Sequence, residues 1–212
     1  MGSSEGCGSV VRGSVVRGCV VRGCVVQGCV VQGCVVRGCF VTPLAIRVGQ
    51  GFDIHRFSDD PSRILVLGGV VFKGEPGLHG HSDADAVAHA VTDALLGAAG
   101  LGDIGQHFPD TDARWKGANS LMLLSHTSRM LGDAGWMVGN VDCSVVCEQP
   151  KLAPHRDEMQ QRLSAAAGGP VTVKGRRAEG LGALGRREGI ACWAVAIIHR
   201  ADTEQFPTES PE

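Results

Sequence analysis

The sequence predicts an α/β (or α+β) fold in which a single domain builds a mostly β sheet covered by helices on one face. Segments rich in Val and Ile, which favour strands, alternate with segments whose apolar residues recur at helical spacing. The apolar run Arg63–Val70 suits a sheet that is covered on one or both faces. The 212 residues are enough for one core with a tail, whereas two domains would be crowded.

The order of the predicted elements follows from these patterns. We expect strands at Ile46–Phe52, Arg63–Val70, Val138–Cys147, Val171–Lys174 and Ala191–His199. We expect helices from Ser82 to about Ala99, from Asn119 to about Asp133, and from Pro154 to Ala167, where Gly168, Gly169 and Pro170 follow as a stop. Ser82 with Asp85 three positions later resembles a capping box at the first helix start. The ordered domain should therefore span residues 44–200.

Residues 1–43 have a different character, because the pentapeptide Ser/Cys-Val-Val-Arg/Gln-Gly repeats from Ser9 to Gly38. Arg or Gln and Gly interrupt every Val pair, so there is no apolar run of the roughly 20 residues that a membrane span needs. The same interruptions exclude the core of about 7–15 apolar residues in a signal peptide. We predict a low-complexity, disordered extension or a start codon assigned too early; a β-solenoid, a Cys-rich metal-binding tract and a transit peptide are the alternatives. Residues 201–212 are predicted to be a disordered tail.

Composition narrows the choice of partners. With 20 Lys+Arg against 22 Asp+Glu the chain is close to neutral, so we expect a small ligand and neither nucleic acid nor a membrane. Only Cys143, Cys147 and Cys192 of the nine cysteines follow residue 43, and their spacing gives no disulfide framework. A reducing cytoplasm is the simplest compartment for such a chain.

Asp53, His55 and His89 form a candidate metal site. Asp53 and His55 are two positions apart, so on a strand both side chains leave the same face. His89 belongs to an alanine-rich helical pattern, and two imidazoles with one carboxylate are the ligand set of a catalytic zinc site with an open fourth position. Asp85 and Asp93 lie one turn either side of His89, so a carboxylate could be its hydrogen-bond partner. On their own, Asp53 and His55 would more often be a hydrogen-bonded pair at a strand end, and His89 a buried core histidine.

Two loops, Asp103–Gly105 and Phe108–Asp112, are rich in turn formers and short hydrogen-bond acceptors. They are candidates for binding hydroxyl groups or a metal-bound water. Asp110 and Asp112 could instead simply cap the following turn.

Taken together and in this order, the motifs resemble those of the 2-C-methyl-D-erythritol 2,4-cyclodiphosphate synthase family. The resemblance covers about Ile46 to Arg200. It rests on Arg47–His55, His81–Asp85, His89, Thr92–Gly97, Gly102–Gly105, Phe108–Asp112, Asn140–Asp142, Pro150-Lys151, His155 and Gly189–Cys192.

The resemblance implies an enzyme of non-mevalonate isoprenoid biosynthesis, a phosphorus-oxygen lyase that catalyses an intramolecular phosphoryl transfer. The 2-phosphate of 4-diphosphocytidyl-2-C-methyl-D-erythritol 2-phosphate would attack the β-phosphorus, and CMP would leave. The family forms a homotrimer with active sites between subunits, which implies the same assembly here. The location would be the cytoplasm of a bacterium, or the plastid of a plant or alga.

Residue roles follow from the same resemblance. Asp53, His55 and His89 would bind Zn²⁺ or another divalent transition metal, and Glu179 would hold a second ion, Mg²⁺ or Mn²⁺. His81 and Arg177 would be catalytic. Substrate binding would involve Asp53, Ile54, His55, His81, Ser82, Asp103, Ile104, Gly105, Phe108, Pro109, Asp110, Thr111, Asp112, Cys147, Pro150, Lys151, Arg177, Ala178, Glu179 and Arg186.

The chain departs from the family pattern in a few places. Arg177 stands where a hydroxyl side chain is usual, Arg187 where Gly is common, and Gln50 where His is usual. A guanidinium binds phosphate oxygens at least as strongly as a hydroxyl, so activity need not be lost. The alternatives to the synthase are a non-catalytic family member that only binds diphosphates and a zinc phosphohydrolase.

Overall fold

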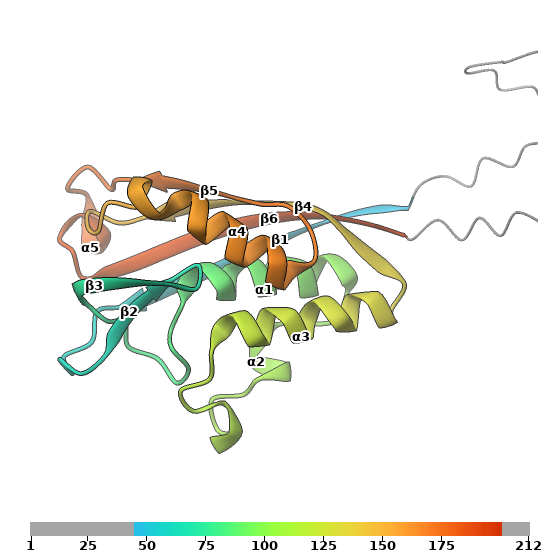
Figure 1. The fold of residues 1–212 in the computed structure, drawn as a ribbon, viewed down its shortest axis with the longest axis horizontal. Coiled ribbons are helices and arrows are strands. Elements are labelled where there is room, and N and C mark those ends of the chain that lie inside the picture. Colours follow the sequence, from blue (N-terminus) through green and yellow to red (C-terminus); the bar gives the residue numbers. More distant parts are fainter. Residues whose placement is uncertain (1–44, 201–212) are drawn as a thin grey trace, which may run out of the picture. The chain divides into compact units, whose positions relative to one another are not determined.

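A four-stranded mixed sheet has three helices against one of its faces (Figure 1). The computed structural model describes residues 45–200, so the predicted extension at 1–43 and tail at 201–212 lie outside the described residues. The strand order is β1-β6-β4-β5. β6 (Gly189–Arg200) pairs antiparallel with both β1 (Ile46–Arg56) and β4 (Trp136–Val146), whereas β5 (Val171–Arg176) is parallel to β4. The predicted α/β architecture is confirmed.

The helices match the sequence-based prediction closely. They are α1 (Ala86–Ala99), α3 (Ser120–Asp133) and α4 (Arg156–Ala167). α4 follows a 3₁₀ turn, η2 (Ala153–His155), and ends at Gly168, whose φ of 75° is readily adopted by a residue without a Cβ. The shorter pieces are α2 (Ile104–His107), η1 (Ala113–Trp115) and α5 (Gly182–Gly185). None of the helices in residues 45–200 is long and apolar enough to span a membrane.

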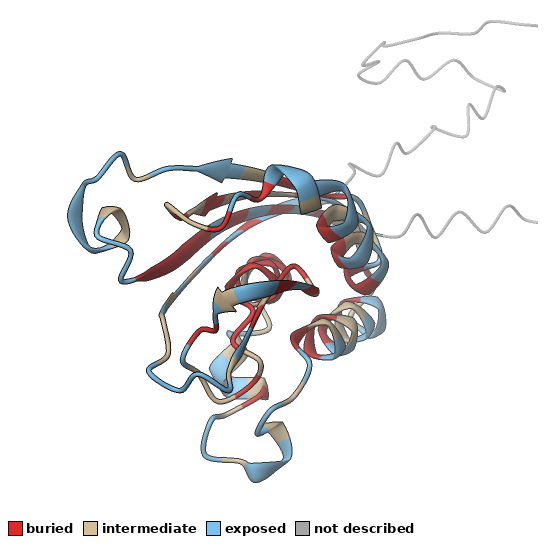
Figure 2. Ribbon diagram, turned by 60° about the vertical axis from the view of Figure 1, so that its left-hand side comes forward, coloured by how far each residue is buried: buried red, intermediate tan, exposed pale blue. Residues whose placement is uncertain are grey.

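The two faces of the sheet differ in burial. Along β6 the side chains of Cys192, Ala194, Ala196 and Ile198 are buried against the helices, whereas Trp193, Val195 and Ile197 on the other face remain exposed. Figure 2 shows the buried residues gathered between the sheet and the helices. One face of the sheet is therefore covered, and the outer face leaves a run of apolar side chains open.

The prediction of a single strand at Arg63–Val70 is wrong. The structure has two short strands there, β2 (Ile64–Leu67) and β3 (Val70–Pro76), which pair as an antiparallel hairpin in a separate two-stranded sheet. Gly68 and Gly69 adopt φ of 57° and 74° and turn the chain back. The apolar composition is the same for one buried strand as for two short strands with a glycine turn, so it could not distinguish them.

The start of α1 also differs from the prediction. Asp85, and not Ser82, is the N-cap: its carboxylate accepts hydrogen bonds from the backbone N–H groups of Val87 and Ala88. The same carboxylate accepts from Gly68 and Gly69 in the hairpin turn, at 2.8 and 2.6 Å. Fully buried Asp85 therefore joins the hairpin to α1, and it is not the hydrogen-bond partner of His89 that helical spacing suggested.

β1 and α1 approach each other closely enough for their backbones to touch. A Cβ placed on Gly49 would lie 2.1 Å from the carbonyl oxygen of Ala94, and one on Gly51 would lie 2.0 Å from that of Ala90. Only glycine fits at such a distance, and the alanines of α1 are the matching small residues. This contact sets the distance between Asp53 and His55 on β1 and His89 on α1.

Candidate metal centre

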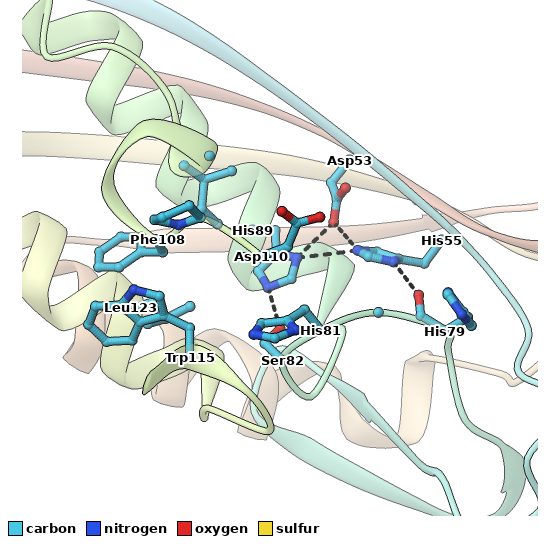
Figure 3. A pocket seen from close by; sticks show the side chains of 14 residues that line it. Asp53, His55, His79, His81, Ser82, His89, Phe108, Asp110, Trp115 and Leu123 are labelled. Carbon is cyan, nitrogen blue, oxygen red and sulfur yellow. Dashed lines mark hydrogen bonds and ion pairs between the residues drawn. The ribbon is translucent and has the colours of Figure 1, made fainter. Parts of the chain in front are cut away.

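Asp53, His55 and His89 converge at the end of the cavity shown in Figure 3. Oδ2 of Asp53 lies 2.9 Å from Nε2 of His55 and 3.0 Å from Nδ1 of His89, and the two imidazole nitrogens are 3.3 Å apart. Asp53 and His55 leave the same face of β1, as their spacing predicted. Among residues 45–200 this is the one group of His, Cys, Asp or Glu side chains close enough to share a metal ion.

The hydrogen bond on the far side of His55 shows which of its ring nitrogens carries a proton. Nδ1 lies 2.7 Å from the carbonyl oxygen of His79, which can only accept, so Nδ1 is the protonated atom. In the neutral ring Nε2 then keeps a lone pair that faces Asp53 and His89. Nε2 of His89 is likewise in contact, 2.8 Å from Oγ of Ser120 and 3.1 Å from Oγ of Ser82. A carboxylate oxygen and imidazole nitrogens directed at one point are the donor set that zinc prefers, so these residues fit a divalent metal.

Electrostatics keep this donor set ready to bind a cation. Burial alone would raise the pKa of Asp53, but hydrogen bonds and charge from His55 and His89 outweigh it and lower the pKa to about 2. The carboxylate is therefore ionised at neutral pH. For His55, burial alone would lower the pKa, and the hydrogen bond with Asp53 raises it above its usual value. In the metal-free protein a proton can thus occupy the place between these groups.

The metal centre opens into a cavity of about 760 Å³. Of the predicted site residues, Asp53, His55, His81, Ser82, His89, Ile104, Gly105, Phe108, Pro109 and Asp110 line it. Figure 3 shows Phe108, Trp115 and Leu123 together at one side of this cavity, with the histidines and Asp53 at the other. It therefore has an apolar wall facing a polar, metal-binding wall, an arrangement that suits an amphipathic small molecule.

Other predicted substrate-binding residues have local structural contacts. Asp103 caps α2 by accepting from the backbone N–H of Gln106 at 2.9 Å. Asp112 caps η1 and pairs with Arg114, which lowers the pKa of the carboxyl. Ile54 is about half exposed and lies on the outer face of β1, and Thr111 does not line the cavity. Asp112 thus caps the following turn, and the roles in substrate binding predicted for Asp103, Asp112, Ile54 and Thr111 stay predictions.

A second group of predicted residues lines a smaller cavity of about 290 Å³. Cys147, Pro150, Lys151 and Arg177 line it, together with Glu148 and Arg176, and it shares no lining residue with the metal cavity. Arg177 donates from Nε to Oε2 of Glu148 at 3.0 Å, which lowers the pKa of Glu148. Within one chain, the predicted site is therefore divided into two separate parts.

Ala178, Glu179 and Arg186 line neither of these cavities. Glu179 has a φ of 51° in the loop after β5 and, within residues 45–200, belongs to no group of three side chains that could share a metal ion. Arg186 pairs with Glu188 at 2.7 Å. Arg187 adopts a φ of 65°, in the left-handed region that favours glycine. The predicted roles of Ala178, Glu179 and Arg186 stay predictions.

Sequence reasoning missed three parts of the site. These are the carbonyl of His79, the hydroxyl of Ser120, and Trp115, which lines the cavity with its ring 5.1 Å from the ring of Phe108. Ser120 stood next to a recognisable helix start at Asn119, which was the one available signal. A backbone carbonyl leaves no signal in the sequence.

Fold and site together define an α/β protein with a candidate metal centre of one carboxylate and two imidazoles beside a ligand cavity. The model of the YgbB family matches residues 46–199, and the chain belongs to this family. A protein of Rubrobacter xylanophilus named 2-C-methyl-D-erythritol 2,4-cyclodiphosphate synthase is 54% identical over 159 residues, which is 73% of this chain and 96% of that relative. One of Cupriavidus pinatubonensis with the same name is 53% identical over 161 residues, 74% of this chain and 94% of the relative.

The family also includes longer proteins. The bifunctional enzyme IspD/IspF of Anaeromyxobacter dehalogenans is 52% identical over 159 residues, and the match covers 74% of this chain but only 40% of that relative. Among solved structures, the bifunctional IspDF of Campylobacter jejuni is 39% identical with a TM-score of 0.71, over 75% of this chain and 43% of the other. The IspF of Plasmodium falciparum in complex with CDP is 32% identical with a TM-score of 0.65, over 74% and 97%.

Proposed function

We propose that this chain is a 2-C-methyl-D-erythritol 2,4-cyclodiphosphate synthase of non-mevalonate isoprenoid biosynthesis. It would convert 4-diphosphocytidyl-2-C-methyl-D-erythritol 2-phosphate to 2-C-methyl-D-erythritol 2,4-cyclodiphosphate and CMP. The observation that carries the proposal is the convergence of Asp53, His55 and His89 beside a cavity, in a chain more than half identical to synthases over nearly their full length. As a phosphorus-oxygen lyase it would form one P–O bond and break another without water.

The chemistry asks the protein mainly to hold and neutralise phosphates. The nucleophile is a phosphate oxygen that is already anionic, so positioning and charge stabilisation dominate. Zn²⁺ bound by Asp53, His55 and His89 would supply a Lewis acid for the diphosphate. His81 and Ser82 line the same cavity and would hold the 2-phosphate at its polar side.

Glu179 would contribute to a second site, for Mg²⁺ or Mn²⁺. A single carboxylate fits such an ion when the substrate's phosphates supply the other oxygens, which is the usual way in which proteins bind Mg²⁺ with nucleotides. Arg177 would place its guanidinium on the transferring phosphoryl group, in place of the family's hydroxyl. Ala178 and Arg186 would complete the phosphate-binding part.

The rest of the substrate would be divided between the two cavities. Ile104, Gly105 and Phe108–Asp110 would surround the methylerythritol, since they line the metal cavity. Cys147, Pro150 and Lys151 in the second cavity would hold the cytidine and its phosphate. The complex of the Plasmodium falciparum relative with CDP supports a cytidine nucleotide as the ligand class.

A homotrimer would unite the two cavities, the metal part of one subunit facing the nucleotide part of the next. Two observations support it. The cavities share no lining residue within the chain. The outer face of the sheet also exposes Ile46, Val48, Phe52 and Ile54 of β1 with Trp193, Val195 and Ile197 of β6, an apolar area typical of an interface. The proposed location stays the cytoplasm of a bacterium or the plastid of a plant or alga.

The test is incubation of the full chain with the substrate, Zn²⁺ and Mg²⁺, with products followed by ³¹P NMR and mass spectrometry. Release of CMP and a cyclic diphosphate is expected, and no CMP under conditions in which the Rubrobacter relative is active would overturn the proposal. Tight binding without turnover would instead indicate a diphosphate-binding protein. A linear product carrying oxygen from labelled water would indicate a phosphohydrolase.

A further inference from the structure

A hydrogen-bonded chain runs from the metal centre to the start of α3. Nε2 of His89 lies 2.8 Å from Oγ of Ser120, and Oγ of Ser120 donates a short hydrogen bond to Oδ1 of Asp83. Oδ2 of Asp83 also accepts from the backbone N–H of Ser120 at 3.0 Å. Ser120 is fully buried, so no solvent competes for its hydroxyl. Asp83 and Ser120 have no role in the function proposed above.

The number of available protons shows which group donates in each hydrogen bond between His89, Ser120 and Asp83. A hydroxyl has a single hydrogen to donate, and a carboxylate has only lone pairs. The hydrogen of Ser120 is therefore given to Asp83, and its oxygen presents a lone pair to His89. Two facing lone pairs at 2.8 Å would repel, so Nε2 of His89 carries a proton. In the neutral ring Nδ1 is then unprotonated, and its lone pair faces Oδ2 of Asp53 at 3.0 Å and Nε2 of His55 at 3.3 Å, so a metal cation, or a proton carried by His55, must lie between them.

We propose that Asp83 and Ser120 are positioning residues that fix the tautomer and the ring orientation of His89, so that Nδ1 is held as a metal ligand. His55 is held in the opposite tautomer, with Nε2 as its free nitrogen, by the carbonyl of His79, whereas His89 depends on two side chains. A partner on the second nitrogen of a ligating imidazole typically changes metal affinity by about 10–100-fold. The inference rests on the metal centre of the proposed function.

The same two residues connect the metal centre to the substrate loop. The backbone N–H of Asp83 donates to the carbonyl of Ala118 at 3.0 Å, and that of Gly117 donates to the carbonyl of His81 at 2.8 Å. Segment 81–83 is thus fastened to segment 117–120, where the loop that includes Phe108, Asp110 and Trp115 ends. A change in the loop can reach His89 through Ser120 without any contact with the metal.

Two substitutions separate this role from simple packing. Asp83→Ala removes the acceptor, so the hydroxyl of Ser120 turns and donates to Nε2 of His89, which reverses the tautomer and places the proton on Nδ1. We expect the affinity for Zn²⁺ to fall by about 10–100-fold. Ser120→Ala leaves Oγ of Ser82, 3.1 Å from Nε2, as a remaining acceptor, so the expected loss is smaller, about tenfold.

Ser125→Ala is the matched control, because Ser125 lies on the same helix and is not among the hydrogen-bond partners of the His89 ring; it should leave zinc affinity unchanged. Ser120→Thr keeps the hydroxyl and should retain most of the affinity. Zn²⁺ affinity is measured on the full chain by competition with a chromophoric chelator, and thermal unfolding checks that each variant is folded. Folded Asp83→Ala and Ser120→Ala proteins with affinities within about twofold of the original, below the range expected of such partners, would overturn the proposal.

The tautomer itself is measured by ¹⁵N NMR of the histidine ring nitrogens in the metal-free protein at a pH where His89 is neutral. We expect the proton on Nε2 in the original chain and on Nδ1 in Asp83→Ala. A proton on Nδ1 of the original chain would overturn the proposal even if a variant does not fold. If the original chain binds no Zn²⁺ at all, the metal centre of the proposed function is wrong, whereas the tautomer measurement still tests the role of Asp83 and Ser120.

Discussion

The guanidinium of Arg177 is hydrogen-bonded to the carboxylate of Glu148, with Nε 3.0 Å from Oε2. The side chain of Arg177 is 66% exposed, whereas that of Glu148 is 7% exposed. Glu148 also accepts from the backbone N–H of Gly180, so the pair connects the loop after β5 to the second cavity. Arg177 is therefore held in place with donors left over for a phosphate.

This placement predicts a specific effect of Arg177→Ala. Loss of a positioned donor to a transferring phosphoryl group should lower kcat by about 10²–10³-fold with little change in zinc affinity. Arg177→Thr, which supplies the hydroxyl usual in the family, should be less impaired. Steady-state kinetics with CMP release as readout provide the measurement, and Arg129→Ala on α3 is the control. Equal kcat for Arg177→Ala and the original chain would remove Arg177 from the mechanism.

Metal removal should lower stability as well as activity. A ligand that binds only the folded state stabilises it by about 2.7 kcal/mol when its free concentration is 100 times Kd. We therefore expect the melting temperature to rise with added Zn²⁺ and to return after chelation. His89→Ala should abolish the shift, whereas His126→Ala, on α3 outside the metal centre, should keep it. A zinc-dependent shift in His89→Ala would indicate another binding site.

Gly51→Ala tests the contact between β1 and α1. The new methyl group would meet the carbonyl of Ala90 at 2.0 Å, so the helix must move, at a cost of about 1–3 kcal/mol. Because β1 and α1 hold different ligands, zinc affinity should fall with stability. Gly132→Ala in α3 is the control: no atom lies within 4 Å of its added Cβ, and alanine favours a helix. Urea unfolding of both variants measures their stability, and zinc titration measures their affinity for Zn²⁺.

The proposed trimer can be tested by a substitution on the exposed apolar face of the sheet. Val195→Lys puts a charge in the centre of the proposed interface and should convert trimers to smaller species, with loss of most activity because the two cavities separate. Met122→Lys is the matched control, since Met122 is 52% exposed on α3 and Val195 is 45% exposed. Sedimentation velocity gives the mass. A trimer that persists in active Val195→Lys would place the interface elsewhere.

Cys147 should react slowly with alkylating reagents. Burial, with a smaller contribution from the charge of Glu148, raises the pKa of its thiol to about 11. The thiolate is therefore a small fraction at pH 8, and that fraction increases as the pH rises toward 11. Peptide mass spectrometry after treatment with iodoacetamide should show faster labelling of Cys147 at pH 10 than at pH 8, with urea-unfolded protein as the fully reactive control. Rapid labelling of the folded chain at pH 7 would contradict this pKa.

Much of this molecule could be predicted from short-range patterns. The helical spacing from Asn119 to Asp133 and the two-residue spacing of Asp53 and His55 gave the correct helix and the correct shared face. What the patterns could not supply depends on contacts between distant segments. Helix geometry allowed a hydrogen bond between the carboxylate of Asp85 and His89. In the structure that carboxylate instead accepts from four backbone N–H groups, two of them in the hairpin.

The division of the site into two cavities was also invisible to residue spacing. Arg177 and His81 were assigned to one site by resemblance, and within the chain they line different cavities. Ser120 was not assigned at all, because its importance comes from its position between His89 and Asp83 and not from its residue type.

The contact of Gly49 and Gly51 with α1 has a consequence for how this protein can change over generations. The spacing between the two metal-binding elements is set by backbone atoms, which are the same in every sequence. A sequence that keeps this distance between Asp53 and His89 must therefore keep the two glycines.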